Sequence, residues 1–101
     1  MANTREQIEI DYRNTIRKAQ RLRELAGELE GIRQSRIGGS LNNLPGAWRG
    51  DASAMYDGKL RKLDDKVRKR IKELRNAADG IEKAAKRLHD AEMYGLSLFG
   101  G

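Results

Sequence analysis

Apolar residues recur every three or four positions along two long stretches of this 101-residue chain, and this spacing limits its fold more than any other feature. Because an α-helix has 3.6 residues per turn, the spacing places the apolar side chains on one face of each helix. A short segment with the only Pro and the only Trp separates the two stretches. The sequence therefore predicts an all-α fold, an antiparallel two-helix hairpin.

The length fits a single helical-hairpin domain over residues 1–101. We expect the first helix over about residues 4–38 and the bend over about residues 39–50, where paired glycines and the proline interrupt helical geometry. The second helix is expected over about residues 51–94, and a flexible C-terminal tail over residues 95–101.

The composition predicts that one hairpin does not cover its own apolar faces. Apolar residues make up 38% of the chain and charged residues 36%, which leaves little material for a wide core. Two hairpins can cover each other as a four-helix bundle, so we expect a dimer: a homodimer, or a heterodimer with a related small protein. The predicted dimer and hairpin seam consists of Ile8, Tyr12, Ile16, Leu22, Leu29, Leu60, Leu63, Val67, Ile71, Leu74 and Ile81.

Two glycines lie inside the first predicted helix. Gly27 and Gly31 are four residues apart, so they share a face. Each costs about 1 kcal/mol relative to alanine in a helix. We expect this cost to be offset by the close approach of a neighbouring helix.

The residues that carry most enzyme chemistry are scarce. The chain has no Cys and a single His, His89, which is flanked by charged residues and is expected to be a solvated helix residue. Its serines have no base and orienting group beside them in the pattern of a catalytic triad. We therefore predict a protein that is not an enzyme, with no catalytic residue, cofactor or metal ligand. The amphipathic N-terminus also differs from a cleavable secretory signal peptide.

Positive charge is concentrated at the start of the second predicted helix. The segment from Lys59 to Arg75 contains nine basic and three acidic residues, which gives it a net charge of +6, equal to that of the whole chain. One interpretation is a basic coiled coil that binds nucleic acid or anionic membrane. The other is the charged, solvated surface that any long helix with a narrow apolar face needs. The segment contains no aromatic residue on which bases could stack.

The bend carries a recognisable motif. Trp48-Arg49-Gly50 lies between two long amphipathic helices of a Cys-free chain of about 100 residues, with Leu44 four residues before the Trp and Tyr56 eight after it. This arrangement resembles the WXG family, the small ESAT-like substrates of type VII secretion in mycobacteria and Gram-positive bacteria. The resemblance covers essentially the whole chain.

The resemblance implies a non-enzymatic hairpin that dimerises into a four-helix bundle and is secreted without a cleavable signal peptide. Its partner would be the ATPase of a type VII secretion system, and its role would lie in virulence or in the export of other substrates. A third possibility is an adaptor for a larger toxin with a similar helical N-terminal region. In an antiparallel dimer, the bend around Trp48 and Gly50 could lie near the partner's C-terminal segment, and the two would form a composite export signal.

The C-terminal segment carries the candidate export signal. The mycobacterial pattern, a Tyr followed four residues later by an acid, is absent, because Leu98 follows Tyr94 at that distance. The pattern of Gram-positive relatives falls on Leu88, Glu92 and Phe99, with Gly95 at its weakest position. The resemblance therefore favours a homodimeric, Gram-positive type of substrate, with Leu88, Glu92 and Phe99 as the export signal candidate.

Overall fold

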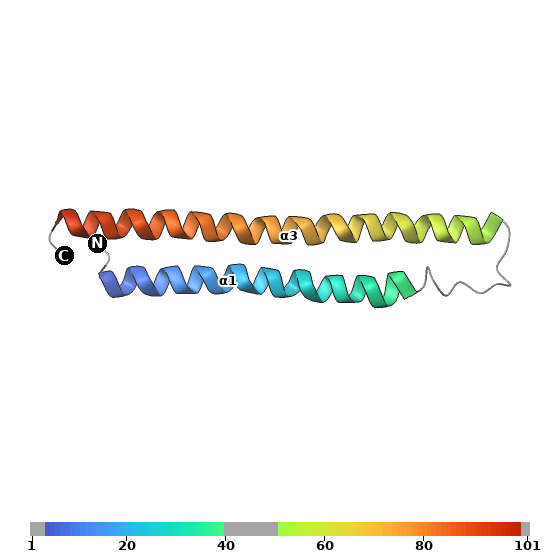
Figure 1. Cartoon of the computed structure of the whole chain (residues 1–101), viewed down its shortest axis with the longest axis horizontal. Coiled ribbons are helices and arrows are strands. Elements are labelled where there is room, and N and C mark those ends of the chain that lie inside the picture. Colours follow the sequence, from blue (N-terminus) through green and yellow to red (C-terminus); the bar gives the residue numbers. More distant parts are fainter. Residues whose placement is uncertain (1–3, 40–50, 100–101) are drawn as a thin grey trace. The chain divides into compact units, whose positions relative to one another are not determined.

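The computed structural model describes residues 4–39 and 51–99, and for residues 51–54 it describes the backbone alone. Within these ranges the chain is helical, with no strand. The helix α1 spans Arg5–Ile32 and continues into a π-helix, η1, at Arg33–Gly38. The helix α3 spans Asp51–Leu98 (Figure 1). The prediction of an all-α helical hairpin is confirmed.

The start of α1 is fixed by its capping residue. The side-chain oxygen of Thr4 accepts a hydrogen bond from the backbone N–H of Gln7 at 3.1 Å, which satisfies one of the free donors at the helix start. The carbonyl of Thr4 accepts the N–H of Ile8 at 3.0 Å. Glu6 lies in the first turn, where its negative charge is favourable beside the helix dipole.

The helix that follows α1 has the wider geometry of a π-helix. In η1 the side chain of Ser35 donates a hydrogen bond to the carbonyl of Gly31 at 2.9 Å, and the side chain of Ile37 is buried. Gly39, the second of the paired glycines, still has helical backbone angles, with φ −60° and ψ −43°. Helical geometry therefore continues through the first part of the region expected to form the bend.

The C-terminal end of α3 lies further along the chain than the sequence suggested. The helix was expected to end at about residue 94, but it continues through Gly95 to Leu98. A glycine costs a helix only about 1 kcal/mol, which the good helix formers around it can offset. Ser97 donates a hydrogen bond from its hydroxyl to the carbonyl of Tyr94 at 2.7 Å, and a tight turn brings the N–H of Phe99 to the carbonyl of Leu96 at 3.2 Å.

The chain packs as two compact units. The first unit combines Met1–Arg23 with Arg75–Gly101, and the second comprises Glu24–Leu74. In the first unit, the start of α1, blue in Figure 1, lies beside the end of α3, red in Figure 1. Glu9 contacts His89 there, whereas Arg23 contacts Asp79, so these two helix segments run antiparallel.

Small residues dominate the buried core. Among the described residues, four of the seven buried hydrophobic side chains are alanines, and no large side chain is completely covered. Most of the predicted seam residues are half-buried; Leu63, in the second unit, is still more exposed. The buried hydrophobic residues are Ile8, Ala19, Ala26, Ile37, Ile71, Ala78 and Ala85.

Gly27 and Gly31 do not mark a close helix contact within the described part of the chain. A Cβ atom added at either position would meet no atom within 4 Å. The expectation that a neighbouring helix approaches at these glycines is therefore wrong for the helices that the structure describes.

Candidate functional site

The residues of the bend motif lie mostly outside the described part of the chain. Leu44, Trp48 and Gly50 belong to the segment at residues 40–50, which the structure does not describe. Tyr56, the fourth residue of the motif, lies in the second turn of α3, where its side chain is partly exposed.

The candidate export residues lie at the end of α3. Leu88, Glu92 and Gly95 belong to one unbroken helix, and Phe99 follows its last residue. The spacing of four and three residues places Leu88, Glu92 and Gly95 on one face of this helix, and Phe99 follows four residues later in the turn after the helix. The Leu88 side chain is 61% exposed and Phe99 is 90% exposed, whereas Glu92 is half-buried. Two large apolar groups therefore stand in solvent on either side of a carboxylate.

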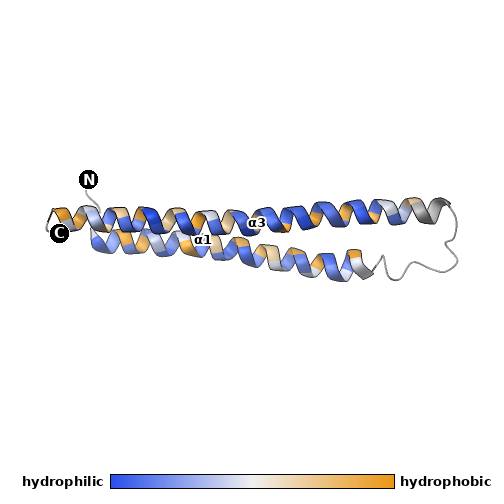
Figure 2. Ribbon diagram, turned by 45° about the horizontal axis from the view of Figure 1, so that its top comes forward, coloured by the Kyte–Doolittle hydropathy of each residue, from blue (hydrophilic) through white to orange (hydrophobic). Residues whose placement is uncertain are grey.

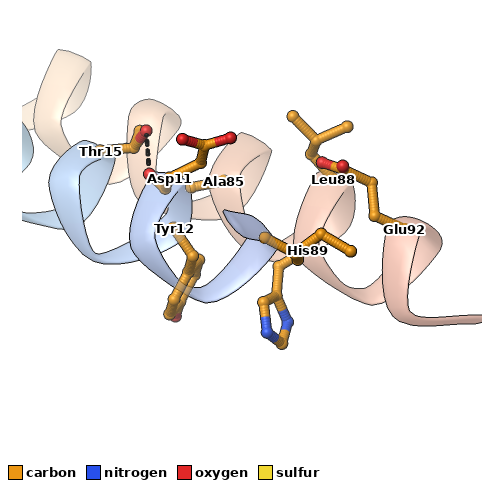
Figure 3. A pocket seen from close by; sticks show the side chains of 8 residues that line it. Asp11, Tyr12, Thr15, Ala85, Leu88, His89 and Glu92 are labelled. Atoms are coloured by element: carbon orange, nitrogen blue, oxygen red, sulfur yellow. Dashed lines mark hydrogen bonds between the residues drawn. The ribbon is translucent and has the colours of Figure 1, made fainter. Parts of the chain in front are cut away.

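A small cavity of about 40 Å³ lies between α1 and α3 in the first unit. In the close view of Figure 3, Leu88 points away from the side on which Tyr12 and His89 project. Asp11 lies on the opposite side from these two rings, and its carbonyl accepts the hydroxyl of Thr15 at 2.9 Å. Leu88 and Glu92, two of the candidate export residues, thus border a surface to which α1 also contributes.

His89 ties the two helices of the first unit together. Its Nε2 atom lies 2.9 Å from a carboxylate oxygen of Glu9 on α1, and its Nδ1 atom lies 3.2 Å from Asp90. The ring of Tyr12 lies with its centroid 4.8 Å from that of the His89 ring. The His89 side chain is only 21% exposed, so the expectation of a solvated histidine is wrong.

The two carboxylates define the charge state that suits His89 best. A neutral imidazole has only one N–H, so it can donate to one of the two carboxylates, whereas the protonated ring donates to both. The hydrogen bonds to Glu9 and then to Asp90 raise the pKa of His89 above its ordinary value. The hydrogen bond from His89 lowers the pKa of Glu9.

A second polar contact joins the same two helices. The guanidinium of Arg23 donates to Asp79 at 2.6 Å and to Glu82, which lies one turn further along α3. The hydrogen bond to Glu82 is the main cause of the raised pKa of Arg23, and it lowers the pKa of the Glu82 carboxyl. Because these side chains are partly exposed, we expect a modest contribution to stability.

The second unit contains a more deeply buried ion pair. The Nε atom of Arg33 lies 2.8 Å from Asp64, and the side chains are only 14% and 15% exposed. Although this distance is that of an ion pair, Nε has no hydrogen-bond partner among the described residues, so the contact is ionic and poorly aligned. Arg33 also contacts Glu30 at 2.9 Å, and Asp64 contacts Arg68 at 3.1 Å.

Eight of the nine basic residues between Lys59 and Arg75 fall into two groups. Three arginines lie beside carboxylates on their own helix: Arg61 beside Asp57, Arg68 beside Asp64, and Arg70 beside Glu73. The five lysines are exposed, and none forms an ion pair with a carboxylate in the described ranges. They are Lys59, Lys62, Lys66, Lys69 and Lys72.

The fold and its surfaces define a small helical-hairpin protein with a shallow core and an exposed apolar end. Residues 7–93 match the WXG100 family, described as proteins of 100 residues with WXG. The match spans most of the chain, and the protein belongs to this family. No curated protein and no solved structure matches the sequence.

Membership of the family fixes the broad class of function. WXG proteins are small helical proteins secreted as substrates of type VII systems, and they are not enzymes. In the described part of this chain, neither helix combines the length and the apolar composition that crossing a membrane requires.

Proposed function

We propose that the protein is a homodimeric type VII substrate of the Gram-positive type, recognised by the secretion ATPase through the C-terminal end of α3. The observation that carries this proposal is the continuation of α3 to Leu98. Because the helix is unbroken, Leu88 and Glu92 fall on one face, and Phe99 lies in the turn directly after it, so an approaching protein meets two exposed apolar groups with a carboxylate between them. A spacing of three and four residues is how helices present anchors to a groove.

The dimer is supported by the limited burial in the second unit. Large apolar side chains there remain partly exposed, although burying a Leu or Ile side chain fully stabilises a protein by about 1.5–3 kcal/mol. A second copy of the chain that covered them would supply the burial that one hairpin lacks. These side chains are Leu25, Ile32, Tyr56 and Leu63.

We further propose that the WxG bend acts with the C-terminal segment as one composite signal, with the bend supplied by the partner chain. This part of the proposal rests on the motif Trp48 to Gly50 in the sequence. The finer role, in virulence or in the export of other substrates, rests on the family resemblance alone.

An export assay tests the C-terminal signal. Phe99→Ala and Glu92→Gln are each produced in a bacterium with an intact type VII system, and the secreted and cellular fractions are compared. Tyr94→Ala is the control, because Tyr94 is also an exposed aromatic residue near the end of α3, at 65% exposure, but lies on a different face of the helix. We expect both signal variants to accumulate inside the cell while the control is secreted. Undiminished secretion of both signal variants would contradict the proposal.

Sedimentation of the purified chain tests the homodimer. We expect twice the mass of one chain for the natural protein and the mass of one chain for Leu63→Glu. Leu63 is half-exposed in a single chain, so a charge at this position should be tolerated by the hairpin but should oppose burial against a second copy. Lys62→Glu is the control, because it introduces the same residue at the adjacent position outside the seam. A single-chain mass for the natural protein would exclude the homodimer and leave a heterodimer with a related chain.

A further inference from the structure

A straight stripe of side chains runs along the first part of α3, on a face that differs from the apolar seam. It starts at Met55 and continues through four lysines, at steps of four, three, four and three residues. This spacing keeps all five residues on one side of the helix. With a rise of 1.5 Å per residue, the stripe is about 21 Å long. We name Met55, Lys59, Lys62, Lys66 and Lys69 the lysine stripe.

The charge of the lysine stripe is not neutralised by nearby carboxylates. Asp57, Asp64 and Glu73 each lie against an arginine of the same helix. Asp65, three residues after Lys62 and four before Lys69, forms no ion pair with either lysine among the described residues. Arginine's planar group pairs well with carboxylates, which leaves the lysine ammonium groups in solvent. None of these lysines has a carboxylate partner among residues 4–39 and 55–99, so their positive fields add along the stripe.

Dimerisation through the seam leaves the lysine stripe accessible. Ile71 is buried and Val67 is half-buried on the seam face. Because neighbouring residues in a helix are about 100° apart, Lys66 and Lys69 point well away from these two side chains. In Figure 2 hydrophilic residues cover much of this part of α3, with apolar residues at intervals. A second hairpin packed against Val67 and Ile71 would therefore leave Lys66 and Lys69 uncovered.

We propose that the lysine stripe binds the surface of an anionic phospholipid membrane. A straight row of ammonium groups matches a plane of phosphates, and long lysine stems can lie along the interface while their charged ends reach the headgroups. Met55, which is 63% exposed at the start of the stripe, supplies an apolar side chain that can enter the interface. This surface is distinct from the candidate export residues.

Two features favour a lipid surface over nucleic acid. The charged residues of the stripe are lysines rather than arginines. Lysine lacks the planar guanidinium group with which arginine forms two hydrogen bonds to one phosphate or base. The segment from Lys59 to Arg75 also has no aromatic side chain on which bases could stack. An exposed methionine contributes to burial in a lipid interface but adds little to binding of a phosphate backbone.

A vesicle flotation assay with the full chain tests the proposal. Vesicles of phosphatidylglycerol and phosphatidylcholine are compared with vesicles of phosphatidylcholine alone, at low salt and at about 0.15 M salt. We expect binding only to the vesicles with phosphatidylglycerol, and weaker binding as the salt concentration rises. The triple variant Lys62→Glu, Lys66→Glu and Lys69→Glu should bind roughly tenfold or more weakly, because each basic residue near an anionic surface contributes separately.

The matched control reverses the same number of charges elsewhere on the same helix. Lys83, Lys86 and Arg87 are exposed in the first unit, so their triple replacement by Glu changes the net charge equally. Circular dichroism confirms that both variants keep their helices. Retained binding by the control supports the stripe. The proposal is overturned if both variants weaken equally, if the natural chain does not float with anionic vesicles, or if it binds duplex DNA or RNA more tightly than vesicles at the same salt.

Discussion

The two units of the hairpin hold their helices together by different means. In the first unit, the polar contacts between α1 and α3 are spread over Arg23 and His89, whose partners are partly exposed carboxylates. In the second unit, an ion pair between Arg33 and Asp64, both largely buried, joins the two helical segments. Exposed ion pairs contribute about 0–1 kcal/mol each, whereas a buried charge depends strongly on its partner.

The second unit is also the one whose helices are intrinsically weaker. Its helical segments contain Gly27, Gly31 and Gly58, and it includes the π-helix η1. It leaves Ile32 and Leu63 exposed as well. We infer that the stability of the second unit depends on a few well-buried groups and on a partner chain. The stability of the first unit comes from several contacts, each of which contributes little.

The largest expected effect is that of Ile71→Ala in the second unit. Ile71 is 3% exposed, and truncating a buried Ile to Ala lowers the free energy of unfolding by about 2–5 kcal/mol. Ile8, in the first unit, is 2% exposed, but it lies in the first turns of α1, where the helix end can fray. We therefore expect a smaller loss for Ile8→Ala, measured by urea unfolding at a fixed protein concentration.

Equal losses for the two isoleucine variants would show that the first unit is as dependent on single buried groups as the second. The exposed variant Ala84→Gly provides the reference for a change that affects helix propensity alone, expected at about 1 kcal/mol.

A smaller effect is expected for Arg33→Met, which removes the buried partner of Asp64 while keeping an apolar side chain of similar length. We expect a loss of roughly 1–3 kcal/mol, because a buried charge loses its partner but Asp64 keeps Arg68 beside it. The control is Arg70→Met, whose ion pair with Glu73 is largely exposed. We expect that variant to unfold within about 0.5 kcal/mol of the natural protein. Similar values for both variants would remove the distinction between buried and exposed pairs.

The fold could be predicted from the sequence because helical periodicity is a local property of the chain. The apolar spacing placed Ile8 and Ile71 on the inner faces of their helices without any knowledge of tertiary contacts. The position at which α3 ends was harder to predict from the sequence, because a single glycine such as Gly95 changes the free energy of a helix by only about 1 kcal/mol. Neighbouring residues can reverse so small a preference.

The contacts that join the helices were not predictable, since they depend on which residues of two distant segments face each other. His89 has charged neighbours in the sequence, which suggests solvent, and only its position opposite Glu9 and Tyr12 reveals its contacts. One signal was available for the second unit. Arg33 continues the spacing of apolar residues through Ala26 to Ile37, so a charge on that face needs a partner.

The smallest expected effect is the pH dependence of the contact between His89 and Glu9. It tests how the first unit responds when one of its contacts between helices weakens. The folded state raises the pKa of His89, so the extra stability is fully present below the ordinary histidine pKa of about 6.5 and is lost as the pH rises through the folded value. The folded state lowers the pKa of Glu9, so its contribution is present above the ordinary carboxyl value and is lost as the pH falls through the folded value.

The contact should therefore be strongest in the window between these two titrations, in mildly acidic solution. Asp90 also faces the ring, while Arg5 and Arg13 act on Glu9 and help to keep it ionised at the acidic edge of the window. Amide hydrogen exchange in the first turns of α1 measures the effect, since those turns open locally if the contact weakens. After division by the intrinsic exchange rate at each pH, we expect lower protection of these amides above the folded pKa of His89 in the natural protein, and no such change in His89→Gln. Exchange in the second unit should not respond to this titration, because its buried pair of Arg33 and Asp64 contains no histidine. A parallel change there would show that the two units open together.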